Sequence, residues 1–110
     1  MKQKILLILL LCFGISIAQE EHAWVFFNSK ENVSTYLADP TLMLTDRAIA
    51  RRNNQGIPVD YTDVPITPSH ITAIVNATGI TYKAKSKWMN AVHVLGTEAD
   101  INALTSLSFV

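Results

Sequence analysis

The side chains of this chain that could take part in chemistry are spread along its length. The nearest grouping of acids, a hydroxyl and an imidazole is Asp60 and Asp63 followed by Ser69 and His70. A Ser-His-Asp set works only when a larger fold brings the three groups together and supplies donors for the oxyanion. Ser69 and His70 instead follow Pro68 as the first turn of a helix would. We therefore expect no catalytic residues, and no enzymatic activity from this chain alone.

Metal and cofactor binding are not indicated either. His22, His70 and His93 are isolated from one another in the sequence, and Cys12 is the single cysteine. Protein sites for zinc combine three or four such ligands at characteristic spacings. The sequence therefore predicts no metal ligands and no cofactor.

The first residues have the pattern of a secretory signal peptide. Lys2 and Lys4 give a positive start, residues 5–17 are almost entirely apolar, and Ser16 and Ala18 place small residues where a signal peptidase reads them. We predict cleavage after Ala18, which makes residues 1–18 a signal peptide and places the protein outside the cytoplasm. The expected location is secreted, periplasmic or in the cell envelope.

Two other fates of this segment are less favoured. A membrane anchor needs roughly 20 apolar residues, whereas the apolar run has about 13. A lipoprotein attached through Cys12 would need a small residue just before the cysteine, and Leu11 stands there. The sequence therefore favours a chain that has no membrane association after removal of the signal.

The remaining residues 19–110 have the size of one small domain. Loss of residues 1–18 removes the only cysteine and two of the nine basic residues, leaving 92 residues with a net charge near −2. Small domains without disulfides are marginally stable, so a binding partner is expected. This negative net charge excludes the basic surface that nucleic-acid binding requires. The one basic cluster, Arg47, Arg51 and Arg52, is interpreted as a solvated helix face.

Strand and helix signals alternate along residues 19–110, without an internal repeat or a low-complexity segment. The expected strands are residues 23–27, 80–84 and 88–95, with the start of another at 107–110. The expected helices are residues 46–54, a helix from Pro68 that ends before Gly79, and a helix after Thr97. Residues 28–40 and 57–65 are expected to be turn-like and extended connectors, and residues 85–87 a hairpin turn.

Each expected helix has local signals at its start. Thr45, Thr67 and Thr97 occupy N-cap positions, and Asp100 follows Thr97 at the spacing of a capping box. Gly56 stands just beyond the end of the first of these helices, as a C-cap glycine does.

Without the helix at 46–54, the order is strand, helix, strand, strand, helix, strand. This is the ferredoxin-like βαββαβ arrangement of an α+β fold, which here carries an extra short helix after the first strand. Its helices would cover one face of the sheet and leave the other open. The last strand would have about four residues, fewer than the usual five or six. We expect a truncated reading frame, and thus a domain incomplete at its C-terminus; a short natural edge strand is the alternative.

The expected strand 88–95 divides its side chains between two faces. Val92 and Val94, with Trp88, make the better core set, and Asn90 shares their face. The opposite face is then the candidate partner surface, with Met89, Ala91, His93 and Leu95. A histidine satisfied within the core is the alternative for His93.

The order and spacing of these segments resemble the propeptides of secreted bacterial subtilisin-like serine peptidases, the subtilases. An aromatic residue and an Asn/Asp-Ala pair mark the third strand of that family, and Trp88 and Asn90-Ala91 match these positions. The resemblance covers most of residues 23–110 and includes Thr78-Gly79-Ile80, the segments 97–104 and 107–110, and the first strand. The block 44–56 is similar to an insertion in some precursors.

The resemblance implies that the chain is the front of a peptidase precursor, with the propeptide-like domain at residues 19–110. Such a propeptide acts as an intramolecular chaperone and inhibitor, and its partner is the cognate catalytic domain, normally in cis. The family's cleft-filling tail would follow the last strand, where this chain ends, so potent inhibition is not implied. The alternative is a freestanding exported protein-interaction module with the same fold.

Overall fold

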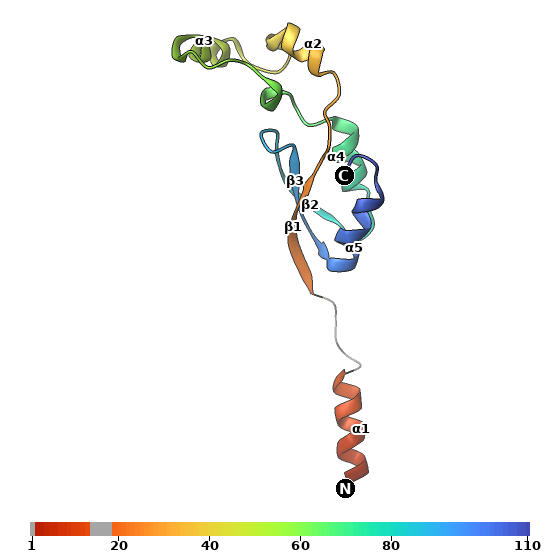
Figure 1. Ribbon diagram of the computed structural model, residues 1–110. Helices are drawn as coiled ribbons and strands as arrows, with labels where there is room; N and C mark the ends of the chain where they lie inside the picture. Colours follow the sequence, from red (N-terminus) through yellow and green to blue (C-terminus); the bar gives the residue numbers. More distant parts are fainter. Residues whose placement is uncertain (1, 14–18) are drawn as a thin grey trace.

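The computed structural model describes residues 2–13 and 19–110 (Figure 1). Helix α1 (Lys2–Phe13) covers most of the apolar run. None of the helices in these two ranges has the length and apolar character needed to cross a bilayer. The predicted cleavage site at Ala18 lies outside the described residues and stays a prediction.

Residues 19–110 form an α+β fold, as predicted. The strands are β1 (Glu20–Phe26), β2 (Thr81–Ser86) and β3 (Ala91–Thr97), and the helices are α2 (Val33–Ala38), α3 (Asp46–Gln55), α4 (Pro68–Val75) and α5 (Glu98–Ala103). Short 3₁₀ turns lie at Pro40–Leu42, Tyr61–Asp63 and Leu104–Ser106. Helices α2 and α3 lie beyond one end of the sheet, near the β2–β3 turn (Figure 1).

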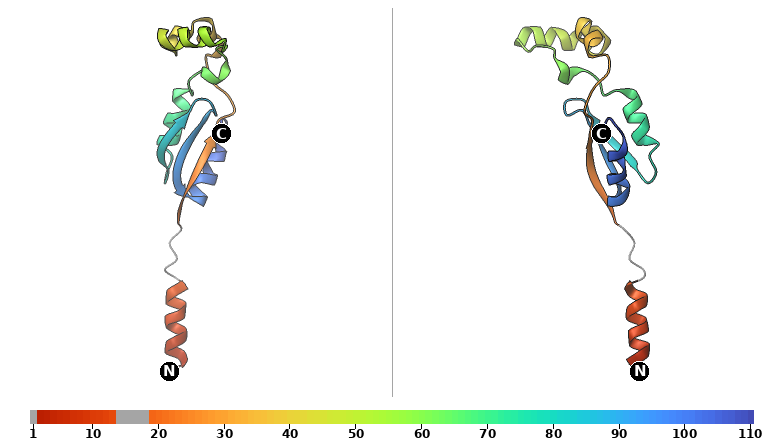
Figure 2. Two further views of the ribbon diagram at one scale, coloured as in Figure 1. Left: turned by 90° about the vertical axis from the view of Figure 1, so that its left-hand side faces the viewer. Right: turned by 45° about the vertical axis from the view of Figure 1, so that its right-hand side comes forward.

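The strands form one antiparallel sheet in the order β1-β3-β2. In β1, Ala23 faces Val94 and Val25 faces Val92, and these side chains point toward the helices. Helices α4 and α5 lie on the same side of the sheet (Figure 2). Apolar burial between these layers is the main stabilising term of such a fold.

The core lies between the sheet and α4, α5 and the chain that follows them. Its buried members are Val25, Phe27, Ile66, Ile74, Val92, Val94 and Leu104. The prediction that Val92 and Val94 belong to the core is therefore confirmed. Ile71 and Ile101, on the apolar faces of α4 and α5, pack against this cluster.

The caps are confirmed for two helices. The hydroxyl of Thr45 accepts a hydrogen bond from the Ala48 N–H at 3.1 Å, and Gly56 ends α3 with a left-handed φ of 68°. The hydroxyl of Thr97 accepts from the Asp100 N–H at 3.2 Å. Thr67 does not cap α4 through its side chain. Its hydroxyl accepts instead from the Glu31 N–H at 2.8 Å, and this contact ties the chain after β1 to α4.

The hairpin turn lies further along the chain than predicted. Residues 87–90 form the turn, β2 extends to Ser86, and β3 begins at Ala91. Trp88, Met89 and Asn90 are therefore turn residues, and their assignment to a strand was wrong. The physical reason lies in Asn90, whose φ of 51° is left-handed and incompatible with an extended strand.

The expected strand at 107–110 is not formed, so residues 19–110 contain three strands of the four in the ferredoxin-like order. The N–H groups of Leu107 and Val110 donate to carbonyls three residues earlier, Leu104 and Leu107, both at 3.1 Å. These donors are thus used in local turns. The segment still meets the end of β1, where the Asn28 N–H donates to the Phe109 carbonyl at 2.9 Å.

Lys30 connects the chain after β1 to two distant segments. Its side chain is buried, and Nζ donates to the carbonyls of Tyr61 at 3.0 Å and Lys87 at 2.8 Å. Nζ also lies 4.7 Å from the centroid of the Tyr61 ring. Burial of the ammonium, together with the nearby charge of Lys87, lowers the pKa of Lys30 below 10.5.

This lowered pKa predicts an alkaline pH dependence of stability. The unfolded chain holds the Lys30 proton up to about pH 10.5, whereas the folded chain releases it at a lower pH. Stability rises with pH wherever the unfolded state binds more protons. The free energy of unfolding of the wild type, measured relative to Lys30→Met, should therefore increase as pH rises from the folded pKa toward 10.5. Urea titrations at several pH values check this; a constant difference between the two proteins contradicts it.

Candidate docking surface

The sheet face turned away from the helices carries exposed aromatic side chains. By the β1–β3 register, Trp24 faces His93, Phe26 faces Ala91, and His22 faces Leu95. Trp24 is 47% exposed and Phe26 is 54% exposed. We call the set His22, Trp24, Phe26, Ala91, His93 and Leu95 the open face. Exposed aromatic residues in such a group are typical of a protein-interaction site.

The predicted partner-binding residues divide between the open face and the turn. Ala91, His93 and Leu95 lie on the open face. Ala91 is fully buried, and His93 and Leu95 are half-buried. Met89 is 44% exposed but lies in the turn, outside the strand pairing. A role of these four residues in partner binding stays a prediction.

Trp88 is not a core residue. Its side chain is 54% exposed, and two cations lie near its ring, Lys87 Nζ at 5.0 Å and Arg52 Cζ at 5.5 Å from the centroid. The core assignment assumed that Trp88 continues the alternation of Val92 and Val94. The turn at 87–90 interrupts this alternation.

Asn90, the first residue of the matched Asn-Ala pair, organises the end of the open face. Its buried side-chain amide donates to the carbonyls of Phe27 and Ser29, both at 3.0 Å, and the backbone carbonyl of Asn90 accepts from the Phe27 N–H at 2.8 Å. These bonds fix the chain that leaves β1 against the start of β3. The next residue, Ala91, is fully buried.

His22 and His93, which are isolated from each other in the sequence, lie together on the open face. His22 Nδ1 and His93 Nε2 are 2.9 Å apart. The ring centroids are 5.0 Å apart, and the Trp24 ring lies 5.4 Å from that of His93. The two residues are 71 positions apart in sequence. Only the register of β1 on β3 brings them together, and the sequence does not display this register.

Trp24 and Phe26 are the functional candidates that the sequence interpretation missed. A signal was available, because residues 22–27 alternate between the two faces in the manner of a half-buried strand. Val25 and Phe27 are buried, whereas Trp24 and Phe26 are exposed. Applying to the first strand the face assignment that was made for the third would have identified both aromatic residues.

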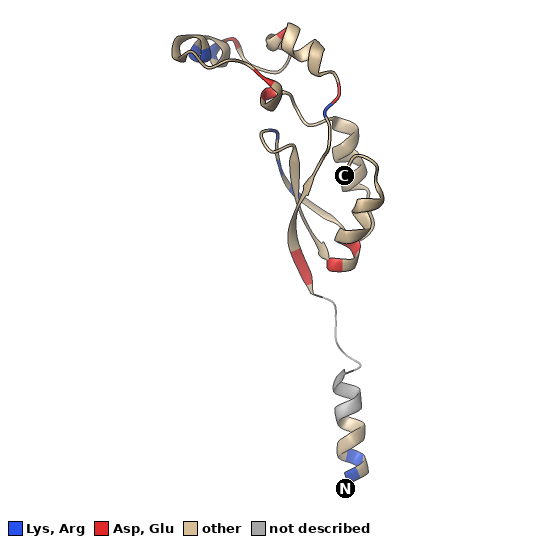
Figure 3. Cartoon of the chain, viewed as in Figure 1, with Lys and Arg blue, Asp and Glu red and all other residues tan. Residues whose placement is uncertain are grey.

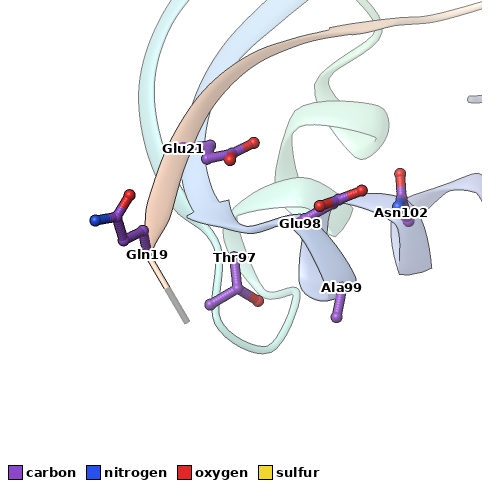
Figure 4. A pocket seen from close by; sticks show the side chains of 6 residues that line it. All are labelled: Gln19, Glu21, Thr97, Glu98, Ala99 and Asn102. Carbon is purple, nitrogen blue, oxygen red and sulfur yellow. The ribbon is translucent and has the colours of Figure 1, made fainter. Parts of the chain in front are cut away.

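Acidic residues and arginines lie at opposite ends of the sheet, β2 carries Lys83 and Lys85, and none of the six open-face residues is Asp, Glu, Lys or Arg. Acidic residues gather at the starts of β1 and α5, and arginines lie on α3 beyond the other end (Figure 3). A hollow of about 500 Å³ lies at the acidic end. Figure 4 shows its lining, with Glu21 from β1 and Glu98 from α5 among Gln19, Thr97, Ala99 and Asn102.

The Ser69-His70 pair has no catalytic geometry. His70 is buried, stacks on the Phe109 ring at a centroid distance of 4.2 Å and an interplanar angle of 3°, and lies 5.3 Å from the Phe27 ring. The three rings contact one another, with the Phe27 and Phe109 centroids 5.8 Å apart, so the imidazole of His70 serves in packing. Within residues 2–13 and 19–110, no group of three or more His, Cys, Asp or Glu side chains is arranged to hold a metal ion.

Comparison with known proteins identifies one family. The family model of the peptidase S8 propeptide domain of Bacteroidota matches residues 22–110. No curated protein matches the chain. No solved structure matches it. The family match spans all of the sheet except the first two residues of β1, and includes every residue of the open face. The resemblance to a subtilisin-like peptidase propeptide is thereby confirmed, and the chain belongs to the Bacteroidota family of peptidase S8 propeptide domains.

Proposed function

We propose that residues 19–110 dock on the catalytic domain of a subtilisin-like serine peptidase through the open face, and act as its chaperone and inhibitor. The observation that carries this proposal is the pair of exposed aromatic side chains, Trp24 and Phe26, on the sheet face opposite α4 and α5. Membership of the propeptide family supplies the partner. The parent precursor is then a secreted serine endopeptidase, and this domain is its non-catalytic part.

The chaperone action follows from selective binding. A molecule that binds only the native state of the peptidase stabilises that state by mass action. The open face suits this task because most of its contact area is preformed on paired strands, so little conformational entropy is lost when it docks. The same contact keeps the propeptide in place on the catalytic domain until it is removed, which supports the inhibitory role.

Export belongs to the same proposal. Residues 1–18 act as a signal peptide with cleavage after Ala18, and the domain is released with its partner outside the cytoplasm. The positive start, the apolar residues of α1 and the exposed Ile5, Leu6, Leu7 and Ile8 support this assignment. N-terminal sequencing of the exported protein tests the cleavage position.

The docking proposal is tested by adding the chain in trans. The catalytic domain of the same precursor, unfolded in denaturant, is diluted with or without the chain, and recovered peptidase activity is measured. Trp24→Ala should weaken binding to the peptidase by about 2 kcal/mol, or roughly 30-fold, because central aromatic residues dominate interface energies. Titrated inhibition and refolding yield both report this loss.

Trp88→Ala is the matched control. Trp88 is as exposed as Trp24 but lies in the hairpin turn, outside the open face. The Trp88→Ala substitution should leave the affinity for the peptidase nearly unchanged. Equal affinities of the wild type and Trp24→Ala would contradict docking through the open face. A chain that neither binds the peptidase nor assists its refolding would favour a freestanding interaction module.

A further inference from the structure

The pair His22 and His93 has the geometry of two ligands for one metal ion. The nitrogens that approach each other, His22 Nδ1 and His93 Nε2, are 2.9 Å apart, and both rings lie on the open face. In the metal-free chain, one of these nitrogens donates its hydrogen to the other. The paired strands β1 and β3 hold both side chains, so the two nitrogens are already close before an ion arrives.

Two imidazole nitrogens this close can occupy neighbouring positions around one divalent transition-metal ion. Imidazole nitrogens bind divalent transition-metal ions such as Zn²⁺ at a distance of about 2.0–2.1 Å. At that bond length, nitrogens 2.9 Å apart subtend an angle of about 90° at the metal, as neighbouring ligands do in square-planar or tetragonal coordination. A tetrahedral site needs nitrogens roughly 3.3 Å apart at the same bond length. A separation of 2.9 Å is compatible with neighbouring positions around Cu²⁺ or Ni²⁺, and the general affinity order of divalent ions places Cu²⁺ above Zn²⁺.

The surroundings accept a cation. None of the six open-face residues is a lysine or an arginine, and Lys83 lies on the neighbouring strand β2, in the bulge next to Ala84, which faces His93. Glu20 precedes His22 by two residues and lies on the same face of β1. Among the described residues no third His, Cys, Asp or Glu side chain completes a three-ligand group. Water molecules, or a donor from a bound partner, must therefore fill the remaining coordination positions.

We propose that His22 and His93 form a surface site for a divalent transition-metal ion, with Cu²⁺ bound most tightly and Zn²⁺ more weakly. Such an ion would lie beside the Trp24 ring, which is 5.4 Å from the His93 ring. This site is independent of docking, because both ligands come from this chain.

The test uses the whole 110-residue chain with Trp88→Phe and Cys12→Ser, which leave Trp24 as its single tryptophan and remove its one thiol. Cu²⁺ is titrated at pH 7.5 while Trp24 fluorescence is recorded, and electron paramagnetic resonance counts the nitrogens bound to copper. The expected result is saturable quenching at one ion per chain, with two coordinated nitrogens. His22→Gln and His93→Gln should each weaken binding about a hundredfold, because one of two linked ligands is lost.

Thr81→Gln is the control, since it places the same new side chain on β2 opposite Leu95. The Thr81→Gln variant should bind Cu²⁺ with the same affinity as the chain without this substitution. Unsaturable quenching, or unchanged affinity in both histidine variants, overturns the site. The two variants lie on different strands, and circular dichroism verifies the sheet in each, so one folded variant decides the question. No peptidase is present, and the result therefore does not depend on the docking proposal.

Discussion

Replacing Arg52 with alanine should lower the free energy of unfolding by about 3–5 kcal/mol, the cost of removing one partner of a buried ion pair. The guanidinium of Arg52 contacts both carboxylate oxygens of Asp63, with Nη1 2.6 Å from Oδ2 and Nη2 2.5 Å from Oδ1. The Asp63 side chain is only 1% exposed. Without Arg52 this carboxylate keeps a single hydrogen bond, from the Asp60 N–H at 3.0 Å. The buried carboxylate would then lose its ion pair, with only the more distant charge of Lys30 nearby.

Arg51→Ala provides the control on the same helix. Arg51 is exposed, and substitutions at such surface positions usually change stability by about 0.5 kcal/mol or less. Urea unfolding of both variants gives the comparison. The double variant Arg52→Met with Asp63→Leu should recover most of the loss, because an apolar pair of similar size can replace a buried ion pair. A loss in Arg52→Ala no larger than that in Arg51→Ala would refute the stabilising role of the pair.

The Arg52–Asp63 pair illustrates what the sequence did and did not predict. The bounds of α3 follow from local chemistry, because the Thr45 cap and the left-handed Gly56 act within one or two turns of the helix. The partner of Arg52 lies 11 residues away, beyond a loop. The interpretation of Arg47, Arg51 and Arg52 as a solvated face therefore failed for Arg52, while Arg47 and Arg51 are exposed as expected.

In the sheet, too, the local features could be predicted from the sequence, whereas the contacts between distant segments could not. The alternation of Val92 and Val94 predicts their burial correctly, because a strand's faces follow from sequence parity. The turn position depends on where one residue adopts a left-handed conformation, and the segment has no Asn-Gly or Asp-Gly dipeptide to mark it. The contact of His22 with His93 depends on the pairing of distant strands. Helix α2, within a polar segment, buries no side chain fully and gives no strong periodic signal.

The second large effect is expected in the hairpin turn between β2 and β3, where Asn90→Ala should destabilise the chain by about 3 kcal/mol or more. A left-handed conformation costs an ordinary residue about 1–2 kcal/mol, and Asn90 has a φ of 51°. Its amide also donates to two carbonyls, those of Phe27 and Ser29. Loss of a partner for a buried polar group costs about 1–3 kcal/mol.

Asn90→Gly separates these two contributions. Glycine adopts a positive φ without steric cost, so this variant should lose the hydrogen bonds but not incur the backbone penalty, and should be more stable than Asn90→Ala by about 1 kcal/mol. Urea unfolding measures both. If the two variants are equally stable, backbone conformation has no part in the effect; if neither is destabilised, the amide does not hold the end of β1. Because Phe27 directly follows the open-face residue Phe26, loosening this contact should also weaken peptidase binding, although no open-face side chain has changed.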